Sequence, residues 1–308
     1  MSKTLNNKSV AKNLILSAAI VLSSSAAAAR PKSTIELLVA GDSWANFLCD
    51  DHGYQKTFDQ LNIKNLKENG DCKSVSKNGV EAGEWMQSEE HQKLLGKLTK
   101  RNQIKFVHLS IGGNDLIARW NKYMNIEEEI QLFERNFLLV SSIVNAVVNQ
   151  RNDVTVVLSG YDFPRFESGH PIVEFQQIFE HMGSPEPVEL NAALIRYHQY
   201  LHRRFLTQEN YMHRFFTIHH LGLMHFHDGI KDAGVAPGTT RNPKYISWLE
   251  SPEDFGGDLN YMTNKKSMKK WFSIFYDAFH LNESGNQKLA EHTFTNIIQP
   301  VMGLPRRR

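Results

Sequence analysis

The most informative part of the chain is the stretch Ile35-Glu36-Leu37-Leu38-Val39-Ala40-Gly41-Asp42-Ser43-Trp44. It begins as an apolar run rich in branched side chains, which is typical of a strand buried in a parallel sheet. The Gly-Asp-Ser turn that follows would lie at the carboxyl end of this strand, where open α/β sheets bind their ligands. A serine in such a turn is more often a plain turn residue or a helix N-cap, so its role depends on the rest of the chain.

Two later motifs place polar side chains in comparable positions. Gly112-Gly113-Asn114-Asp115 follows the apolar run 104–111, and Asp277-Ala278-Phe279-His280 lies close to the C-terminal end. Each motif is common in turns when it stands alone. Their order behind the Gly-Asp-Ser turn is what makes them informative, because each would present a polar group at the same edge of a parallel sheet.

The apolar pattern between these motifs predicts the fold class. Strands are predicted at 35–40, 74–76, 104–111, 154–160 and 215–218, and helices at 55–68, 84–98, 126–148 and 188–205. Strands and helices that alternate in this way indicate right-handed βαβ units. The prediction is an α/β protein: a three-layer α/β/α sandwich around a mainly parallel five-stranded sheet.

Taken in order, the motifs resemble those of the SGNH (GDSL-type) hydrolases, a family of serine esterases, lipases, thioesterases and carbohydrate deacylases. The resemblance covers nearly the whole chain after its N-terminal segment. It implies a flavodoxin-like fold and an ester hydrolase in which Ser43 is the nucleophile, His280 the base and Asp277 the acid that orients it. It also implies an oxyanion hole made by the backbone N–H of Ser43, the Asn114 amide and the N–H of a glycine.

The identity of that glycine stays open between two positions in one turn. Counted from Asn78, Gly83 is the better match to the family, and Gly79 is its rival. A glycine in a turn can also be a plain conformational requirement. The chain departs from the family at Trp44, which stands where leucine is common after the serine, and this affects substrate fit more than chemistry.

The residue types themselves suit acyl transfer. A carboxylate three residues before a histidine can accept a hydrogen bond from one ring nitrogen, while the other nitrogen takes the proton of a serine. An amide such as that of Asn114 donates to an oxyanion without changing its protonation state. No organic cofactor is expected, because these groups supply nucleophile, base and electrostatics. A common α/β-hydrolase would instead need a Gly-x-Ser-x-Gly elbow well inside the chain.

The substrate stays open between lipid esters, lysophospholipids included, and O-acetyl groups on a polysaccharide. Trp44, Trp85 and Tyr161 are predicted to contact it, since aromatic rings both stack on sugars and line acyl grooves. A loop-rich insertion is predicted at about 228–264, either as a cover of the cleft or as surface decoration. The alternative to an enzyme is an inactive binding module of the same fold.

The N-terminal segment 1–29 has the features of a secretory signal peptide. Three lysines precede the short apolar segment 14–22, which is followed by serines and alanines. A retained membrane anchor is the alternative, but the apolar part is shorter than the ~20 residues that a spanning helix needs. The hydrolase domain would then occupy 30–308, in the periplasm or outside the cell, without a transmembrane segment.

The charge balance and the cysteine and histidine patterns limit the partners. Lysine and arginine number 35 against 33 acidic residues in 308, so nothing points to nucleic acid. Export permits a disulfide between Cys49 and Cys72, the two cysteines of the chain, although two free thiols fit the sequence equally well. The histidines at 213–227 lack the spacing of a zinc site, so no metal is expected. The oligomeric state is open.

Overall fold

The computed structural model describes residues 34–207, 214–229, 257–272 and 274–305. The predicted signal peptide, 1–29, lies outside the described residues, and so does most of the predicted insertion at 228–264. The contacts within the chain separate a unit that begins at Thr34 from the segment before it. In the described part, no helix has both the length and the apolar character needed to cross a membrane.

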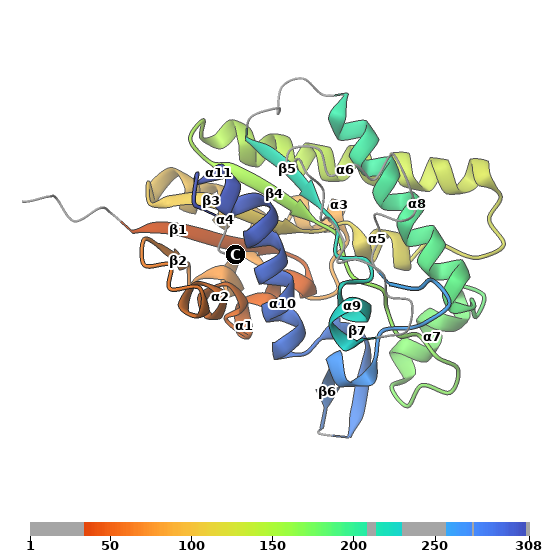
Figure 1. Ribbon diagram of the computed structural model, residues 1–308. Coiled ribbons are helices and arrows are strands. Elements are labelled where there is room, and N and C mark those ends of the chain that lie inside the picture. The colour runs from red at the N-terminus through yellow and green to blue at the C-terminus, as the bar shows by residue number, and fades with distance from the viewer. Residues whose placement is uncertain (1–33, 208–213, 230–256, 273, 306–308) are drawn as a thin grey trace, which may run out of the picture. The chain divides into compact units, whose positions relative to one another are not determined.

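Five parallel strands form the central sheet in the order β2-β1-β3-β4-β5 (Figure 1). They are β1 (Ile35–Gly41), β2 (Leu66–Glu68), β3 (Ile104–Ser110), β4 (Thr155–Ser159) and β5 (Phe215–Ile218). β1 lies between β2 and β3, and its side chains from Leu37 to Ala40 are fully buried. Gly41 pairs with Ser110, so the residues that follow β1 and β3 emerge side by side at one edge of the sheet.

Helices cover both faces of the sheet, which confirms the predicted three-layer α/β/α sandwich. On one side α6 (Ile126–Gln150) packs against α4 (Glu89–Lys100) and α8 (Pro187–Leu206). On the other side α10 (Glu283–Thr293) packs against α1 (Ser43–Asp50) and α2 (Gly53–Gln60). The remaining helical elements are η1 (Cys72–Val75), α3 (Ala82–Met86), α5 (Gly113–Ile117), α7 (Val173–His181), α9 (Leu223–Asp228), η4 (Lys265–Ser267), η5 (Phe294–Ile298) and α11 (Gln299–Val301).

The long helix α6 follows the signals in its sequence. The Asn125 side chain accepts from the N–H of Glu128, and the Glu128 carboxylate accepts from the N–H of Asn125, which together form a capping box. Apolar side chains at helical spacing, such as Phe133, Val140 and Val147, are buried against the sheet side. The helix predicted at 126–148 is therefore confirmed.

Two predicted elements beside β1 are wrong. The helix predicted at 55–68 ends at Gln60, and its last part is strand β2, because Leu66–Glu68 gain backbone hydrogen bonds by pairing with β1. The strand predicted at 74–76 is mostly the turn η1, and only Ser76 forms a single bridge, to Gly41. Three-residue segments carry too little periodicity to separate these alternatives.

The helix predicted at 84–98 is in fact two helices, α3 and α4. The break falls at Ser88, whose hydroxyl accepts a hydrogen bond from the N–H of His91 and caps the second helix. Glu89 and Glu90 follow the cap in the first turn, where negative charge is favourable. The capping sequence therefore starts a new helix where the apolar spacing alone predicts a continuous one.

A separate antiparallel hairpin, β6 (Met268–Trp271) and β7 (Phe275–Leu281), carries the last of the three motifs. Its pairing is irregular, because Met268 faces Leu281 while Lys270 faces Tyr276, so β7 holds extra residues that β6 does not match. These extra residues lie within 277–280, which face Lys269 alone. In a regular strand, side chains three positions apart point to opposite faces, whereas the bulged backbone here lets them meet.

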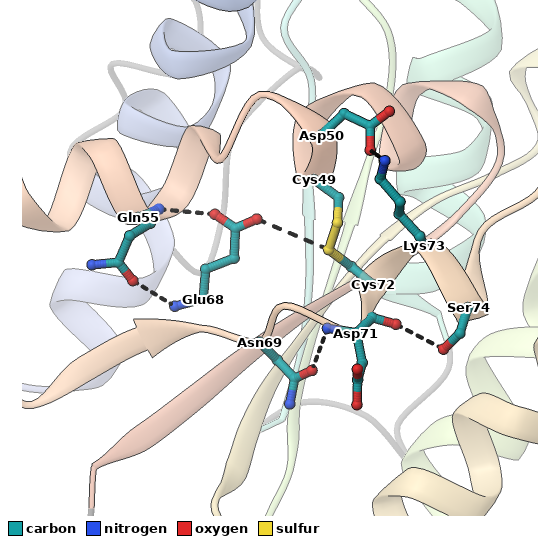
Figure 2. The surroundings of a disulfide bond; sticks show 9 residues. All are labelled: Cys49, Asp50, Gln55, Glu68, Asn69, Asp71, Cys72, Lys73 and Ser74. Carbon is teal, nitrogen blue, oxygen red and sulfur yellow. Dashed lines mark hydrogen bonds and ion pairs between the residues drawn. A yellow bond between two sulfur atoms is a disulfide. The ribbon is translucent and has the colours of Figure 1, made fainter.

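Figure 2 shows the disulfide between Cys49 and Cys72, which joins α1 to η1. The two Cα atoms lie 6.0 Å apart, and both residues are buried. Glu68 of β2 lies beside the bridge, with a carboxylate oxygen 4.0 Å from the Cys72 Sγ. Burial raises the pKa of Glu68 to about 7. Of the two states that the sequence leaves open, the structure has the disulfide.

Replacing Cys49 and Cys72 together by alanine should lower the free energy of unfolding by about 3 kcal/mol, the value that the chain-entropy model gives for a loop of this length. Urea denaturation of the parent and of the double variant, each with and without reductant, measures the difference. Reductant should destabilise the parent and leave the variant unchanged. A parent that keeps its full stability after complete reduction contradicts the prediction.

Candidate active site

The sharp turn after β1 fixes the position of Ser43. Gly41 has a φ of +135°, and a Cβ there would lie 1.9 Å from the Ser110 carbonyl oxygen, so only glycine fits. Asp42 is the N-cap of α1, and its Oδ1 accepts a hydrogen bond from the N–H of Trp44 at 3.0 Å. Ser43 is therefore the first residue of α1, where a backbone N–H has no partner within the helix.

The structure places the side chains of Ser43 and Asp277 within hydrogen-bond distance of the two ring nitrogens of His280. His280 Nε2 lies 2.7 Å from Ser43 Oγ. His280 Nδ1 lies 2.9 Å from Asp277 Oδ2. When Nδ1 donates its proton to the carboxylate, Nε2 is the acceptor that faces the serine hydroxyl. The irregular pairing of β7 is what allows Asp277 and His280 to meet.

Asp277 is fully buried and accepts several hydrogen bonds. Besides His280 Nδ1, its oxygens accept from the N–H groups of Phe279 and His280, at 2.7 and 2.8 Å, and from Trp271 Nε1 at 2.7 Å. Burial by itself raises the pKa of Asp277, but the hydrogen bonds and the charge of His280 outweigh it and hold the pKa below its ordinary value. The carboxylate is therefore ionised at neutral pH.

Asn114 lies beside Ser43, together with one of the two candidate glycines. Asn114 Nδ2 donates to the Val80 carbonyl oxygen at 3.0 Å, which leaves the second N–H of the amide for another acceptor. Asn114 and Gly79 both line the cleft that contains Ser43. Gly83 lies in the first turn of α3 and lines a different hollow. Gly83, which the spacing favours, therefore does not line this cleft, whereas Gly79 does.

The cleft has a volume of about 360 Å³, within the range of small-molecule sites. Most of its side chains are apolar, and they are Phe47, Ile117, Ala118, Phe166, Phe175, Ile178, Trp271 and Phe279. Helix α7 and the β6–β7 hairpin contribute several of them. Sequence reasoning missed α7, although the helical spacing of apolar residues within 173–181 is a signal that could have found it.

The three aromatic residues predicted to contact substrate are core residues, and this corrects the prediction. Trp85 is fully buried, and Trp44 and Tyr161 are 4% and 2% exposed. Trp44 stacks on Tyr161 with ring centroids 4.8 Å apart, and Phe279 meets both rings edge-on. None of the three is among the described residues that line the cleft. Successive helical residues point about 100° apart, so adjacency to Ser43 does not aim Trp44 at the substrate.

Two buried carboxyl groups support the site, and sequence reasoning gave neither a role. Tyr161 donates its hydroxyl proton to Asp42, and Ser110 Oγ lies 3.4 Å from the same carboxyl group. Burial raises the pKa of Asp42 to about 7, although the hydrogen bond from Tyr161 lowers it. Asp115 accepts from the N–H of Ala82 at 2.8 Å and so anchors the start of α3 beside the cleft.

The buried histidines do not gather three ligand atoms in the described part of the chain. His220 Nδ1 and His292 Nδ1 lie 3.0 Å apart, within hydrogen-bond distance of each other. His213 lies outside the described residues. Among the described residues, the side chains close enough together to hold one metal ion are those of Cys49, Glu68 and Cys72. Its two sulfurs are joined in the disulfide, so they offer no thiolate.

No protein-family model matches the chain, and no curated protein matches it in sequence. The chain is similar to a carbohydrate esterase of family 3 from Talaromyces cellulolyticus, at 9% identity and a TM-score of 0.42, over 88% of this chain and 100% of that one. It is similar to the aryl esterase of M. smegmatis, at 12% identity and a TM-score of 0.43, over 88% of this chain and 100% of that one. It is also similar to the lipase Lip_vut3 from a goat rumen metagenome, at 12% identity and a TM-score of 0.45, over 86% of this chain and 98% of that one.

Replacing Asn114 by alanine should lower kcat for a soluble ester by about 10²–10³, the usual effect of removing one oxyanion donor. KM should change little, because the oxyanion exists only in the transition state. Steady-state hydrolysis of a nitrophenyl ester measures both constants. Asn78→Ala removes another amide that lines the cleft and is the matched control. Parental kcat in a folded Asn114→Ala protein would exclude this residue from the oxyanion hole.

Proposed function

We propose that the protein is a serine esterase that hydrolyses carboxylic esters through an acyl-enzyme on Ser43. The observation that carries this proposal is the unbroken series of contacts from Ser43 Oγ through His280 to Asp277, 2.7 and 2.9 Å long, at the wall of an apolar cleft. A serine hydroxyl, a histidine and a buried carboxylate in this order activate the serine as a nucleophile.

In the first step Ser43 Oγ attacks the ester carbonyl carbon while His280 Nε2 takes the hydroxyl proton, and Asp277 stabilises the imidazolium. The oxyanion accepts hydrogen bonds from the Ser43 N–H and the Asn114 amide, and from a backbone N–H of the turn 78–83. His280 then protonates the leaving alcohol. In the second step His280 takes a proton from water, which attacks the acyl carbon, and His280 then returns this proton to Ser43 Oγ as the acid leaves.

We also propose that the acyl group is apolar, as in a lipid or aryl ester. Apart from the side chains with proposed catalytic roles, the polar side chains that line the cleft within the described residues are those of Asn78, Glu81 and Glu174, and Glu81 is already paired with Arg119. A sugar presents several hydroxyl groups, and each that is buried needs a polar partner. An acyl chain needs none. An O-acetyl ester on a polysaccharide is therefore the second candidate.

Export of the enzyme remains part of this proposal. The segment 1–29 reads as a signal peptide, and the hydrolase domain then occupies 30–308. The disulfide between Cys49 and Cys72 supports the same location, because such bonds form and persist in oxidising compartments. Comparison of the mass of the protein purified from periplasm or medium with that of the full chain tests the cleavage.

Activity and labelling test the proposed function together. The purified protein should hydrolyse nitrophenyl esters and react with a fluorophosphonate, and mass spectrometry should place one adduct on the peptide that contains Ser43. Ser43→Ala is the control and should carry no adduct. A preference for medium or long acyl chains supports a lipid ester, and activity on acetyl alone supports the second candidate. A folded protein with neither labelling nor hydrolysis would contradict the enzyme and favour a binding module.

A further inference from the structure

Three large apolar side chains are exposed at the turn of the β6–β7 hairpin. Phe272 is 86% exposed, Ile274 67% and Phe275 38%. They lie within four positions of the chain, and the strands β6 and β7 extend away from the central sheet (Figure 1). We call these three residues the hairpin tip. Exposed apolar side chains that gather in this way mark an interaction surface more often than a random surface position.

The backbone of the hairpin tip is unfavourable for the residue it carries. Phe272 has a φ of +53°, in the left-handed region that glycine and asparagine adopt at lower cost. Such a conformation costs on the order of 1–3 kcal/mol unless the surroundings compensate. At 86% exposure the Phe272 side chain has almost no packing within the described chain to provide that compensation. The Ile274 N–H donates to the Trp271 carbonyl oxygen across the turn, so the backbone is held while the Phe272 side chain stays exposed.

Positive charge accompanies the hairpin tip. Lys269 and Lys270 precede it on β6, and neither forms an ion pair with a carboxylate in the described residues. Their ammonium groups lie over aromatic rings instead: Lys269 Nζ is 3.9 Å from the ring centroid of Phe47, and Lys270 Nζ is 5.1 Å from that of Tyr276. Among the described residues, no carboxylate therefore neutralises either charge.

We propose that the hairpin tip docks on an anionic lipid surface, with its apolar side chains inserted between the lipids and Lys269 and Lys270 against the headgroup phosphates. Aromatic and aliphatic groups beside lysines are the combination that binds membrane interfaces. A stable protein partner needs about 800 Å² on each side, more than three side chains at one turn offer. A bilayer accepts a small apolar protrusion without a matching shape.

Docking through this hairpin would bring the site to the lipid surface. Trp271 and Phe279, on the same two strands, line the cleft, and the acid and base are carried by β7. The docking surface goes beyond the proposed function, because it binds lipid whether or not Ser43 reacts. Only its kinetic consequence, faster hydrolysis of esters held in a membrane, depends on the esterase.

Vesicle flotation tests the binding step, with the chain from residue 30 onward in the Ser43→Ala form so that no lipid is consumed. The protein should float with vesicles of phosphatidylcholine and phosphatidylglycerol, and much less with phosphatidylcholine alone. Phe272→Ser/Ile274→Ser should lower the partition coefficient about tenfold or more, since two large apolar side chains no longer insert. Lys269→Gln/Lys270→Gln should lower it several-fold for each lysine removed, and only on the anionic vesicles.

The matched control is Tyr123→Ser/Ile126→Ser. These residues are 75% and 61% exposed, but Lys122, which lies over the Tyr123 ring, is paired with Glu189, and Glu127 and Glu128 follow Ile126. The control variant should bind vesicles as the parent does. Equal losses in both double variants, or no binding of the parent to anionic vesicles, would overturn the proposal. Self-association that the Phe272→Ser/Ile274→Ser change abolishes, without vesicle binding, would assign the hairpin tip to a second copy of the chain instead.

The kinetic arm uses the protein with Ser43 intact. Phe272→Ser/Ile274→Ser should leave hydrolysis of a soluble short-chain ester unchanged and lower hydrolysis of a vesicle-held ester about tenfold, in proportion to the lost binding. Binding without any hydrolysis would contradict the proposed esterase and leave the docking surface intact. Hydrolysis of both esters at parental rates by this variant would overturn the docking surface and leave the esterase intact.

Discussion

Replacing Asp277 by asparagine should lower kcat by about 10⁴, the effect expected when the catalytic histidine is held in the wrong tautomer. The reason lies in the donors around the carboxylate. Oδ1 accepts from the N–H groups of Phe279 and His280, and Oδ2 accepts from Trp271 Nε1 and His280 Nδ1. Asparagine has one oxygen for these two positions, and its NH₂ group must occupy the other.

If the amide oxygen of the introduced asparagine kept the two backbone donors, its NH₂ would face His280 Nδ1, which must then be unprotonated. The proton would move to Nε2, and Nε2 could no longer accept from Ser43 Oγ. The opposite orientation would set NH₂ against two backbone N–H groups and cost stability. Steady-state kinetics and thermal unfolding separate these effects. Trp271→Phe removes one donor to the same oxygen and should cost much less, so an equal loss in both variants would contradict the tautomer argument.

The free energy of unfolding should fall by about 2 kcal/mol per pH unit as the pH drops from about 6 to 5. Burial lowers the pKa of a set of histidines, to about 3 for His108 and His198 and about 4 for His202, and in the same direction for His219, His220 and His225. In the unfolded state each of these histidines has a pKa near 6.5 and binds a proton below that pH. In the folded state it stays neutral until the pH is much lower. Their contribution to stability is therefore lost as the pH falls.

A smaller set of carboxyl groups acts in the opposite direction. Burial raises the pKa of Asp42, Glu68 and Asp162 to about 7 and that of Asp115 to about 6. A carboxyl group with a raised pKa binds its proton in the folded state first, so its contribution declines as the pH rises from about 4 to 7. The histidines are more numerous, so acid destabilisation prevails below pH 6. The opposing carboxyl groups place the stability maximum near pH 6.5.

Urea denaturation between pH 5 and 7.5 measures this profile. His202→Gln should reduce the acid slope by about 1.4 kcal/mol per pH unit, the contribution of one titrating group. Glutamine can keep a hydrogen bond to Thr217 Oγ1, which His202 Nδ1 makes at 2.8 Å. A slope that His202→Gln leaves unchanged, or a parent protein equally stable at pH 5 and 6.5, would contradict the assignment to buried histidines.

The positions of the two proposed reactive groups Ser43 and Asn114 could be predicted because both groups follow strands. Ser43 and Asn114 each come directly after an apolar run, and parallel strands bring such positions to one edge of a sheet. The lining of the cleft was not predictable in this way. It depends on how α7 and the β6–β7 hairpin pack, and neither follows a long periodic segment. Trp44 and Tyr161 show the difference, since both lie beside active-site motifs but pack against each other in the core.

Short secondary-structure elements were also not predictable from the sequence. Leu66–Glu68 is a strand because β1 offers backbone partners at its edge, and three residues carry no pattern that reveals this. Asp277 and His280 meet only because β7 is bulged, a property that depends on pairing with β6. Contacts between segments that are distant in sequence therefore determine the parts of the site that local sequence patterns do not predict.

The distance along the chain between Ser43 and His280, 237 positions, has a consequence for folding. The proposed nucleophile follows β1, whereas the proposed base belongs to β7, the last strand among the described residues. Contacts of such large sequence separation close late, because loop-closure entropy opposes them until other structure has formed. In a refolding experiment, far-ultraviolet circular dichroism should therefore recover before ester hydrolysis does. The lag between the two signals measures the time that the β6–β7 hairpin takes to dock on α1.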